Sequence, residues 1–416
     1  MKKIVRFTEI LLVISAFFGS CDALDDSIST GKPLIQEEPQ NEIQNDRVVL
    51  PQTRLTLPDS EKNMIAPSNE FSLRYFRNVY EVGSNMLLSP LGIQMTLAMI
   101  GNLVKDDMPL CEMLGFKGKT IGEVNGYFKH LIEDFSGEKC GKELKMANAL
   151  MSDVKAKKYP EEFMDILKTS YYADYLEIVA ASISDQPVGS RPEDLWCQEK
   201  TGGMIKSAPF SIQETQSSLL NTICFNGEWQ DKFDKSLTTQ NRFFVNTKES
   251  TQVSMMNKTG KFNYFKNQDF SSVSLPFGDG TYSFSIILPN TAFDVKGLLE
   301  KLDSKVWDTI RSSLVKKTIV LSIPVFSSSY TRQMLLGYEY KDGINPFDVL
   351  AQKVTFLMNE DGASAAAVTQ TGIYTSPGRS DDQIEHFTAN SPFLYTISET
   401  GSGLVVFIGA FTGSPL

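Results

Sequence analysis

The chain has 416 residues, of which 41% are hydrophobic and 11% aromatic, and its formal net charge is -10. This length and composition are typical of a globular protein with one large domain or two ordinary ones, and they exclude a disordered or fibrous chain. The acidic balance argues against nucleic-acid binding, because such a surface repels phosphate backbones and no run of Lys and Arg with interleaved aromatic residues offsets it.

Residues 1–20 have the pattern of an export signal. A basic start precedes the apolar run 10–18, which is too short to span a bilayer. The run ends at Phe18-Gly19-Ser20-Cys21, which resembles the lipobox of bacterial lipoproteins. We therefore expect a cleaved signal peptide and a diacylated Cys21, so that the lipid alone would link the chain to a membrane. The alternative is an ordinary cleaved signal that leaves Cys21 as a free thiol.

Residues 21–62 are rich in acidic and small polar side chains and show no sustained apolar period. Such a segment is typical of a flexible tether. Asp25-Asp26, shortly after Cys21, also resembles the acidic sorting signals that send some lipoproteins to the cell surface. We expect an exported protein that is lipid-anchored at the outer membrane or cell surface, with a periplasmic or secreted location as the alternative.

The elements that follow change character along the chain. A helix is expected from Ser68, capped by Ser68 or Asn69, and a second from Pro90, which is apolar on most sides and should be buried. The second half holds short strand-like runs at 282–288, 319–325 and 404–411, separated by Gly, Pro and Asn turns. Helices early and strands late predict an α+β domain with large sheets.

The sequence offers no recognisable catalyst. Its two histidines, His130 and His386, lie outside any metal or triad motif, and no G-x-S-x-G elbow is present. Gly118-Lys119-Thr120 ends like a phosphate-binding loop, but Met113 stands where that motif needs its first glycine, so we interpret it as a surface turn. An exported protein of this kind is more often a binder or blocker than an enzyme, and we expect no cofactor.

Four further cysteines have no C-x-x-C pair and no histidine at metal spacing: Cys111, Cys140, Cys197 and Cys224. A zinc site or other metal site is therefore not expected. One disulfide is conceivable in an oxidising compartment, but the wide separations favour buried free thiols.

Three separated segments resemble the serpin family. They are 85–93 (NMLLSPLGI), 220–229 (LNTICFNGEW), and 359–369 (NEDGASAAAVT), the last followed by 391–395 (SPFLY) and 407–409 (FIG). The resemblance covers roughly residues 65–416. It implies a monomer with a single serpin domain at 63–416, in which helices pack on a large central β-sheet with two further sheets. An exposed reactive-centre loop is then expected at about 360–390.

The resemblance also implies a suicide inhibitor of serine, and possibly cysteine, endopeptidases. The peptidase would cut the loop, and the hinge, residues 360–369, would enter the central sheet as a strand while the peptidase stays covalently bound. Taken alone, the small side chains of the hinge also fit a linker or short helix. The alternatives in function are a non-inhibitory carrier or chaperone, or a surface binding lipoprotein. The expected hinge residues are Glu360, Gly362, Ala363, Ala365, Ala366, Ala367 and Thr369.

Two further sites are implied. The family register places the cut after Ser376, but Pro377 follows, and most peptidases cleave poorly before proline. The cut bond is therefore expected to follow Tyr374 or Thr375 instead. Arg379 is expected to be a substrate site or a second bait. The sheet-opening cluster is expected at Ser89, Asn221, Gln352 and Trp229; Gly92 stands where relatives have a second serine, and Gln352 where they have a histidine.

Overall fold

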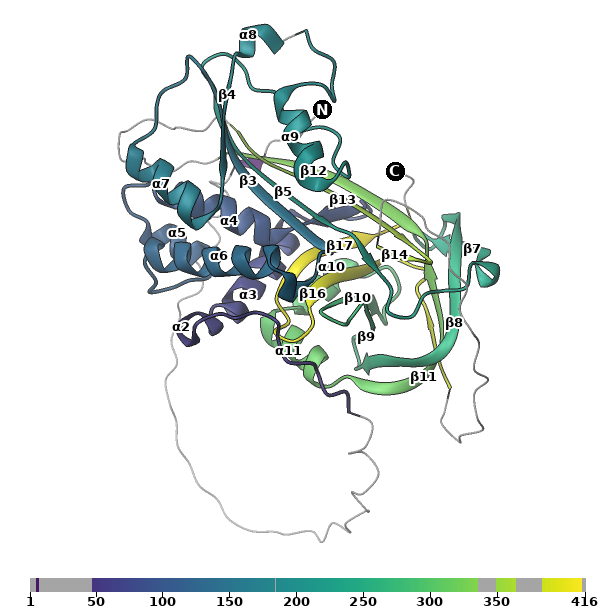
Figure 1. Cartoon of the computed structure of the whole chain (residues 1–416). Helices are drawn as coiled ribbons and strands as arrows, with labels where there is room; N and C mark the ends of the chain where they lie inside the picture. The colour runs from purple at the N-terminus through teal and green to yellow at the C-terminus, as the bar shows by residue number, and fades with distance from the viewer. Residues whose placement is uncertain (1–4, 7–46, 184, 336–348, 364–383, 414–416) are drawn as a thin grey trace, which may run out of the picture.

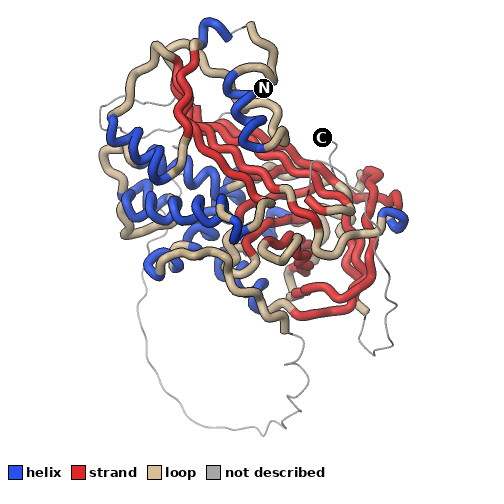
Figure 2. Tube along the Cα trace, viewed as in Figure 1, coloured by secondary structure: helices blue, strands red, loops and turns tan. Residues whose placement is uncertain are grey.

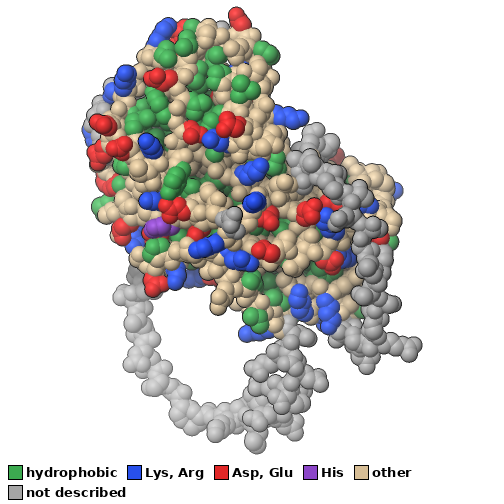
Figure 3. Space-filling model, viewed as in Figure 1, with side chains coloured by type: hydrophobic (Ala, Val, Ile, Leu, Met, Phe, Trp, Pro, Cys, Tyr) green, Lys and Arg blue, Asp and Glu red, His purple; other side chains and the backbone are tan. Residues whose placement is uncertain are grey.

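The computed structural model describes residues 5–6, 47–183, 185–335, 349–363 and 384–413. Helices gather on one side of the molecule and long strands run through the rest (Figure 1, Figure 2). This arrangement confirms the α+β class expected from the sequence. On the face shown in Figure 3, acidic and basic side chains of the described residues are interspersed. No helix among the described residues is long and apolar enough to cross a membrane.

The helices agree with the sequence where a local cap decides their start. Helix α4 begins at Pro90 because the Ser89 hydroxyl accepts a hydrogen bond from the Gly92 amide. Helix α3 begins at Ile65, so Ser68 lies inside it rather than at its cap. The helices are α2 (Asp59–Lys62), α3 (Ile65–Val79), α4 (Pro90–Gly101), α5 (Met108–Met113), α6 (Ile121–Ser136), α7 (Glu161–Ser170), α8 (Ala180–Ile183), α9 (Pro192–Thr201), α10 (Val295–Lys301) and α11 (Ser304–Ser312), with 3-10 turns η2 (Glu138–Cys140) and η3 (Lys235–Leu237).

The turn before α6 has a structural role. Thr120 caps α6 in a reciprocal capping box with Glu123, and Gly118 supplies a φ of +75°. The interpretation of Gly118-Lys119-Thr120 as a surface turn is therefore confirmed.

The central sheet has the order β1-β12-β13-β5-β3-β4, and β14 and β6 join it beside β13. Strands β13 and β5 run parallel, whereas β12 and β13 run antiparallel. Helix α9 crosses in front of β3 and β5 in Figure 1, and α4 packs against β5 and β13. The strands are β1 (Val5–Arg6), β3 (Leu144–Asp153), β4 (Asp174–Ile178), β5 (Ser217–Phe225), β6 (Gly227–Glu228), β12 (Phe326–Leu335), β13 (Val349–Asn359) and β14 (Gly362–Ala363).

The remaining strands form one continuous sheet, where two separate sheets were expected. The long strand β8 joins them, because it pairs with β7 and β11 and then with β9. The order is β15-β11-β8-β9-β10-β16-β17-β2, with β7 beside β8. The strands are β2 (Met86–Leu88), β7 (Thr239–Phe244), β8 (Ser250–Lys266), β9 (Phe270–Pro276), β10 (Tyr282–Pro289), β11 (Val315–Pro324), β15 (Glu385–Thr388), β16 (Phe393–Glu399) and β17 (Val405–Phe411).

The folded domain begins earlier than the sequence suggested. Leu55 and Leu57 are buried in the core, and the Thr56 amide and hydroxyl both donate to Asp134. Residues 55–57, inside the segment expected to be a tether, therefore already contact the domain. Val5–Arg6 lies parallel to Met334–Leu335, and a leader removed on export would take this two-residue strand with it.

The cysteines of the domain are buried free thiols, as favoured by the sequence: Cys111, Cys140, Cys197 and Cys224. Burial raises the pKa of Cys111 and Cys224 to about 11 and the pKa of Cys140 and Cys197 to about 12.

Candidate functional site

The start of the hinge is already part of the central sheet. After β13 the chain turns back, and β14 pairs antiparallel with the end of β13, with Ala363 opposite Met358. On its other side β14 pairs antiparallel with β6, with Ala363 opposite Gly227. The Asn359 side-chain oxygen accepts hydrogen bonds from the amides of Asp361 and Gly362, which fixes the turn. Strand β14 therefore lies between β13 and the strand that continues β5.

Gly362 is required at this position for two reasons. Its φ is +148°, a backbone conformation that L side chains rarely adopt. A Cβ there would lie 2.2 Å from the Gly227 carbonyl oxygen. The glycine of the hinge therefore allows the chain to enter the sheet in close contact with β6.

The segment that follows β6 holds the base of the hinge through its backbone. The Trp229 indole donates to the Asn359 carbonyl at 2.9 Å, and the Trp229 amide donates to the Asp361 carbonyl at 2.9 Å. The Phe233 amide donates to the Glu360 carbonyl at 3.0 Å. Trp229 itself is fixed by stacking on Phe277, with ring centroids 4.5 Å apart.

Side chains add two polar contacts. The Thr238 hydroxyl donates to Glu360 Oε1 at 2.7 Å, and Lys235 Nζ lies 2.7 Å from Asp361 Oδ2. The hydrogen bond to Asp361 raises the pKa of Lys235. Asp361 is buried, so this ion pair has one partner shielded from water. The sequence did not single out Lys235, Thr238 or Asp361, because no local pattern links positions more than a hundred residues apart.

Below the hinge, β5 and β13 form a short parallel ladder that we call the seam. It consists of five pairs, from Val349 opposite Ser218 to Lys353 opposite Thr222. C-terminal to Lys353, the residues of β13 have no partner in β5. Met358 and Asn359, near the end of β13, pair with β14 instead.

Ser89 and Gln352 latch the core face of the seam. The Ser89 amide donates to Gln352 Oε1 at 3.0 Å, and Gln352 Nε2 donates to the Ser89 carbonyl at 2.8 Å. The Ser89 hydroxyl donates to the Val406 carbonyl at 2.8 Å. These residues are fully buried, so the glutamine makes both of its bonds to backbone where relatives have a histidine.

Asn221 lies opposite Gln352 in the ladder, but its side chain bonds elsewhere. Asn221 Nδ2 donates to Asn148 Oδ1 at 2.9 Å, and Asn148 donates to the Tyr171 carbonyl. Asn221 Oδ1 is buried and has no hydrogen-bond partner among the described residues. A Cβ on Gly92 would lie 2.1 Å from this oxygen, so the Asn221 amide fills the space that a serine at position 92 would need.

The structure thus divides the expected sheet-opening cluster into two groups. Ser89, Asn221 and Gln352 meet at the seam, whereas Trp229 contacts the base of the hinge at the end of the same strands. Of the hinge residues, Glu360, Gly362 and Ala363 are placed. The others lie outside the described residues, as do Cys21 and the bait-bond candidates: Ala365, Ala366, Ala367, Thr369, Tyr374, Thr375, Ser376 and Arg379.

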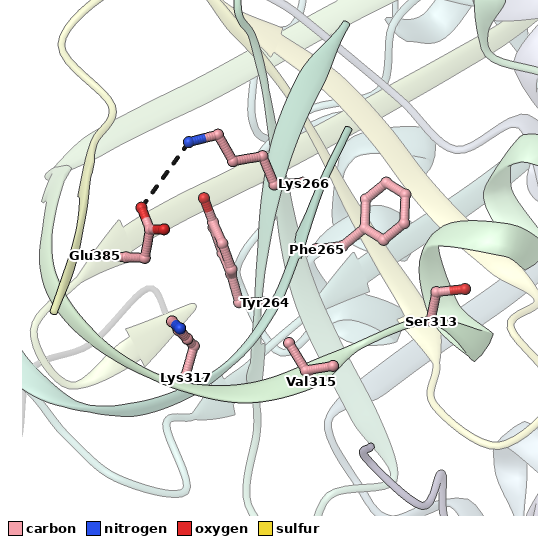
Figure 4. Close-up of a pocket in the computed structure, with 7 residues that line it drawn as sticks. All are labelled: Tyr264, Phe265, Lys266, Ser313, Val315, Lys317 and Glu385. Atoms are coloured by element: carbon pink, nitrogen blue, oxygen red, sulfur yellow. Dashed lines mark ion pairs between the residues drawn. The ribbon is translucent and has the colours of Figure 1, made fainter. Parts of the chain in front are cut away.

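The chain re-enters the described structure at Ile384 and forms β15, which pairs parallel with β11. A pocket of about 330 Å³ opens at the start of β15 (Figure 4), lined by Tyr264, Phe265, Lys266, Ser313, Val315, Lys317 and Glu385. Lys266 Nζ lies 3.9 Å from Glu385 Oε2, and burial together with Glu385 raises the pKa of Tyr264 to about 12. The pocket shares no residue with the hinge or the seam.

The described residues hold no set of three His, Cys, Asp or Glu side chains that could bind a metal ion. The family model described as serpin (serine protease inhibitor) matches residues 66–336 and 347–413. The chain belongs to the serpin family.

Named relatives include inhibitors of peptidases. The serpin is 24% identical to intracellular coagulation inhibitor 2 of Tachypleus tridentatus, over 84% of this chain and 91% of that protein. It is 27% identical to the human leukocyte elastase inhibitor, over 84% of this chain and 99% of that protein. These relatives support a role as a peptidase inhibitor.

Solved structures show the same fold. The thermophilic serpin tengpin in the native state has a TM-score of 0.73 and 22% identity, and the match covers 86% of this chain and 95% of that chain. Human thyroxine-binding globulin in complex with thyroxine has a TM-score of 0.72 and 19% identity, covering 85% and 99%. The serpin fold expected from the sequence is therefore confirmed.

Proposed function

We propose that this serpin is a suicide inhibitor of serine or cysteine endopeptidases that acts by inserting its hinge into the central sheet after the loop is cut. The observation that carries the proposal is the position of β14. It lies at the open end of the seam, antiparallel to both β13 and β6, and so has the direction that a further strand between β13 and β5 would need.

The two registers of β14 agree on where the hinge would go. Ala363 is opposite Met358 on one side and Gly227 on the other. Counting on from these pairs brings residue 369 opposite both Gln352 and Asn221, which are themselves partners in the uncut sheet. A strand can therefore enter the seam without any slip of β5 against β13.

Side-chain size supports the same register. Ala363 faces the core, so alternation along a strand would turn residues 365, 367 and 369 to the core as well. Residue 365 would lie between Phe225 and Phe356, which leaves room only for a small side chain. Residue 369 would bring the Thr369 hydroxyl next to the unpartnered Asn221 Oδ1.

The chemistry that follows is an interrupted acyl transfer. The peptidase's serine or cysteine attacks the bait carbonyl, the peptide C–N bond breaks, and the new amino terminus leaves, so the loop becomes an ester or thioester of the peptidase. Insertion of about 15 residues at roughly 3.3 Å each would carry the peptidase on the order of 50 Å. Distortion of its active site would then stop water from releasing it.

The sequence of the loop suggests which peptidases are trapped. We propose productive cleavage after Tyr374 or Thr375, because Pro377 disfavours a cut after Ser376. Tyr374 suits an enzyme with a deep apolar pocket, and Thr375 suits one with a small pocket, in keeping with a relative named as a leukocyte elastase inhibitor. A cut after Arg379 would lengthen the arm and favour escape of the peptidase.

The test is to mix the serpin with chymotrypsin, pancreatic elastase and trypsin and to look for an SDS-resistant complex. We expect one with chymotrypsin or elastase, and none when the peptidase is first inactivated at its nucleophile. Mass spectrometry of the released peptide should show that it begins at Thr375 or Ser376. A loop that is cut by all three enzymes without any complex would contradict inhibition and indicate a non-inhibitory carrier.

We further propose that the serpin works as a monomer at the outer membrane or cell surface, anchored by lipid on Cys21. The support is the lipobox-like sequence before Cys21 and the acidic tether that follows it. Metabolic palmitate label should enter the full-length chain and be lost from Cys21→Ala. Equal labelling of the two chains would contradict lipidation of Cys21.

A further inference from the structure

The pocket at the start of β15 is formed by three neighbouring strands (Figure 4). Tyr264 of β8 pairs with Val315 of β11. Glu385 of β15 pairs with Ile319, farther along β11. Side chains alternate along a strand, so Lys317 lies on the same face of β11 as Val315 and Ile319. The pairing of β8, β11 and β15 thus brings the side chains of Tyr264, Lys317 and Glu385 to one face of the sheet.

The Tyr264 side chain is a buried polar wall of this pocket. Its exposed fraction is 6%, and its hydroxyl forms no hydrogen bond with any other described residue. In Figure 4 the hydroxyl points towards the space between Lys266 and Glu385. Burial, together with the charge of Glu385, raises the pKa of Tyr264 to about 12, so the phenol keeps its proton at neutral pH. The pocket therefore presents a hydrogen-bond donor that has no acceptor among the described residues.

Two lysines add positive charge beside this donor. Lys317 is half-buried, and its ammonium forms no ion pair or hydrogen bond with any other described residue. Lys266 Nζ lies 3.9 Å from Glu385 Oε2, and the two side chains are 54% and 33% exposed. An ion pair of that length and exposure contributes little, so Lys266 can also bind a second anion. Two ammonium groups thus face one carboxylate, and the pocket keeps a surplus of positive charge in a chain whose net charge is -10.

The remaining lining adds a small apolar surface. Val315 and Phe265, both half-buried, line the pocket together with the charged groups. The volume of about 330 Å³ is at the lower end of the range for small-molecule sites. The pocket therefore offers space for a small organic molecule that has one acidic group and one apolar body.

We propose that this pocket binds a small organic anion, in which a single carboxylate or sulfate group is carried by an apolar ring. The acidic group lies between the ammonium groups of Lys266 and Lys317 and accepts a hydrogen bond from the Tyr264 hydroxyl. The ring packs against Val315. Glu385 repels the anion, and it thereby disfavours ligands with more than one negative charge. The site is separate from the proposed inhibitory function and does not depend on it.

The experiment titrates the full-length serpin with 1-naphthoate at neutral pH and follows binding by isothermal calorimetry. We expect one saturable site with a Kd below about 1 mM, and no binding of 1-naphthylmethylamine, which carries a positive charge on the same ring. Because the ligand binds only the folded chain, it should also raise the melting temperature once its concentration exceeds the Kd.

Single substitutions assign the binding to this pocket. Lys317→Met keeps the length of the side chain and removes its charge, so it should weaken binding about tenfold. Tyr264→Phe removes only the hydroxyl and should weaken binding about threefold to tenfold. Glu385→Gln should tighten binding, because the repulsion of the anion is lost. Lys261→Met is the matched control, since Lys261 is exposed on the opposite face of β8, and its Kd should equal that of the wild type.

Three results would overturn the proposal. The first is a wild type that shows no saturable binding of 1-naphthoate at millimolar concentration. The second is equal binding by the wild type, Lys317→Met and Tyr264→Phe, which would place the ligand elsewhere on the chain. The third is equal binding of 1-naphthoate and 1-naphthylmethylamine, which would mean that the ring alone is recognised. If Lys317→Met does not fold, the opposite effects expected of Tyr264→Phe and Glu385→Gln decide the outcome.

Discussion

Gly362 sets the geometry of the hinge at the scale of a single residue. Its φ of +148° and its lack of a Cβ next to the Gly227 carbonyl allow β14 to pair with both β13 and β6. Under the proposed mechanism, Gly362 and Ala363 would already occupy the sheet before the loop is cut.

Replacing Gly362 by Ala should displace β14, since the new Cβ would lie 2.2 Å from backbone oxygen that cannot move aside. We expect a lower melting temperature of the intact protein and more substrate turnover per covalent complex formed with the peptidase. Gly83→Ala is the control, because φ there is +81° but a Cβ would meet no atom within 4 Å. It should carry only the backbone strain, about 1 kcal/mol.

Thr369 is expected to supply the donor that Asn221 Oδ1 lacks in the uncut protein. Thr369→Val keeps the shape and removes the hydroxyl, so it should reduce the stability of the loop-cut form by about 1–3 kcal/mol and leave the intact form unchanged. Guanidinium unfolding of both forms measures this. Thr371→Val is the matched control, because the same register places it beside the apolar Leu219. Equal losses in the two variants would contradict the register.

The elements show why part of this site could be predicted from sequence and part could not. Helix α4 was predicted correctly because Ser89 and Pro90 decide its start locally. The sequence also indicated the strands near 282–288 and 404–411, since apolar side chains dominate them. The bonds of Asn221 were not predictable, because its partner Asn148 is brought near by the pairing of β3 with β5.

If the hinge inserts as a strand, the side chains on its core-facing side must be small and apolar. Ala365→Arg should convert the inhibitor into a substrate, because the register puts the charge between Phe225 and Phe356, where no counter-charge offsets its burial. The measurement is the ratio of cut to covalently complexed serpin on a denaturing gel. Ser364→Arg is the control on the opposite face, where the register places it beside the exposed Asn226, and it should retain more inhibition. Full inhibition by Ala365→Arg would contradict insertion.

Among the described residues two large sheets share a core, and in the central one β5 and β13 meet over a single short ladder. In the other sheet, β16 is paired with β10 and β17 along its length, so that sheet leaves no gap for a further strand there. In the central sheet, five residue pairs close the seam, backed by the Ser89 latch on the core face. In the proposed mechanism, completing the central sheet with a further strand is the source of free energy.

Cutting the loop should release this energy and raise the thermal stability of the whole serpin. The inserted strand would form ladder hydrogen bonds on both of its edges, each contributing roughly 0.5–1.5 kcal/mol, and a net gain of several kcal/mol would move the melting temperature by at least about 10 °C. Calorimetry of the intact protein and of uncomplexed protein cut after Tyr374 by chymotrypsin measures the shift. Ala365→Arg cut in the same way is the control and should gain little, because its charge blocks entry beside Phe225. If cutting leaves the melting temperature of the wild type unchanged, as in the variant, the intact fold is not metastable, because a kinetically trapped fold must become more stable when its strand is freed. The protein would then be a non-inhibitory member of its family.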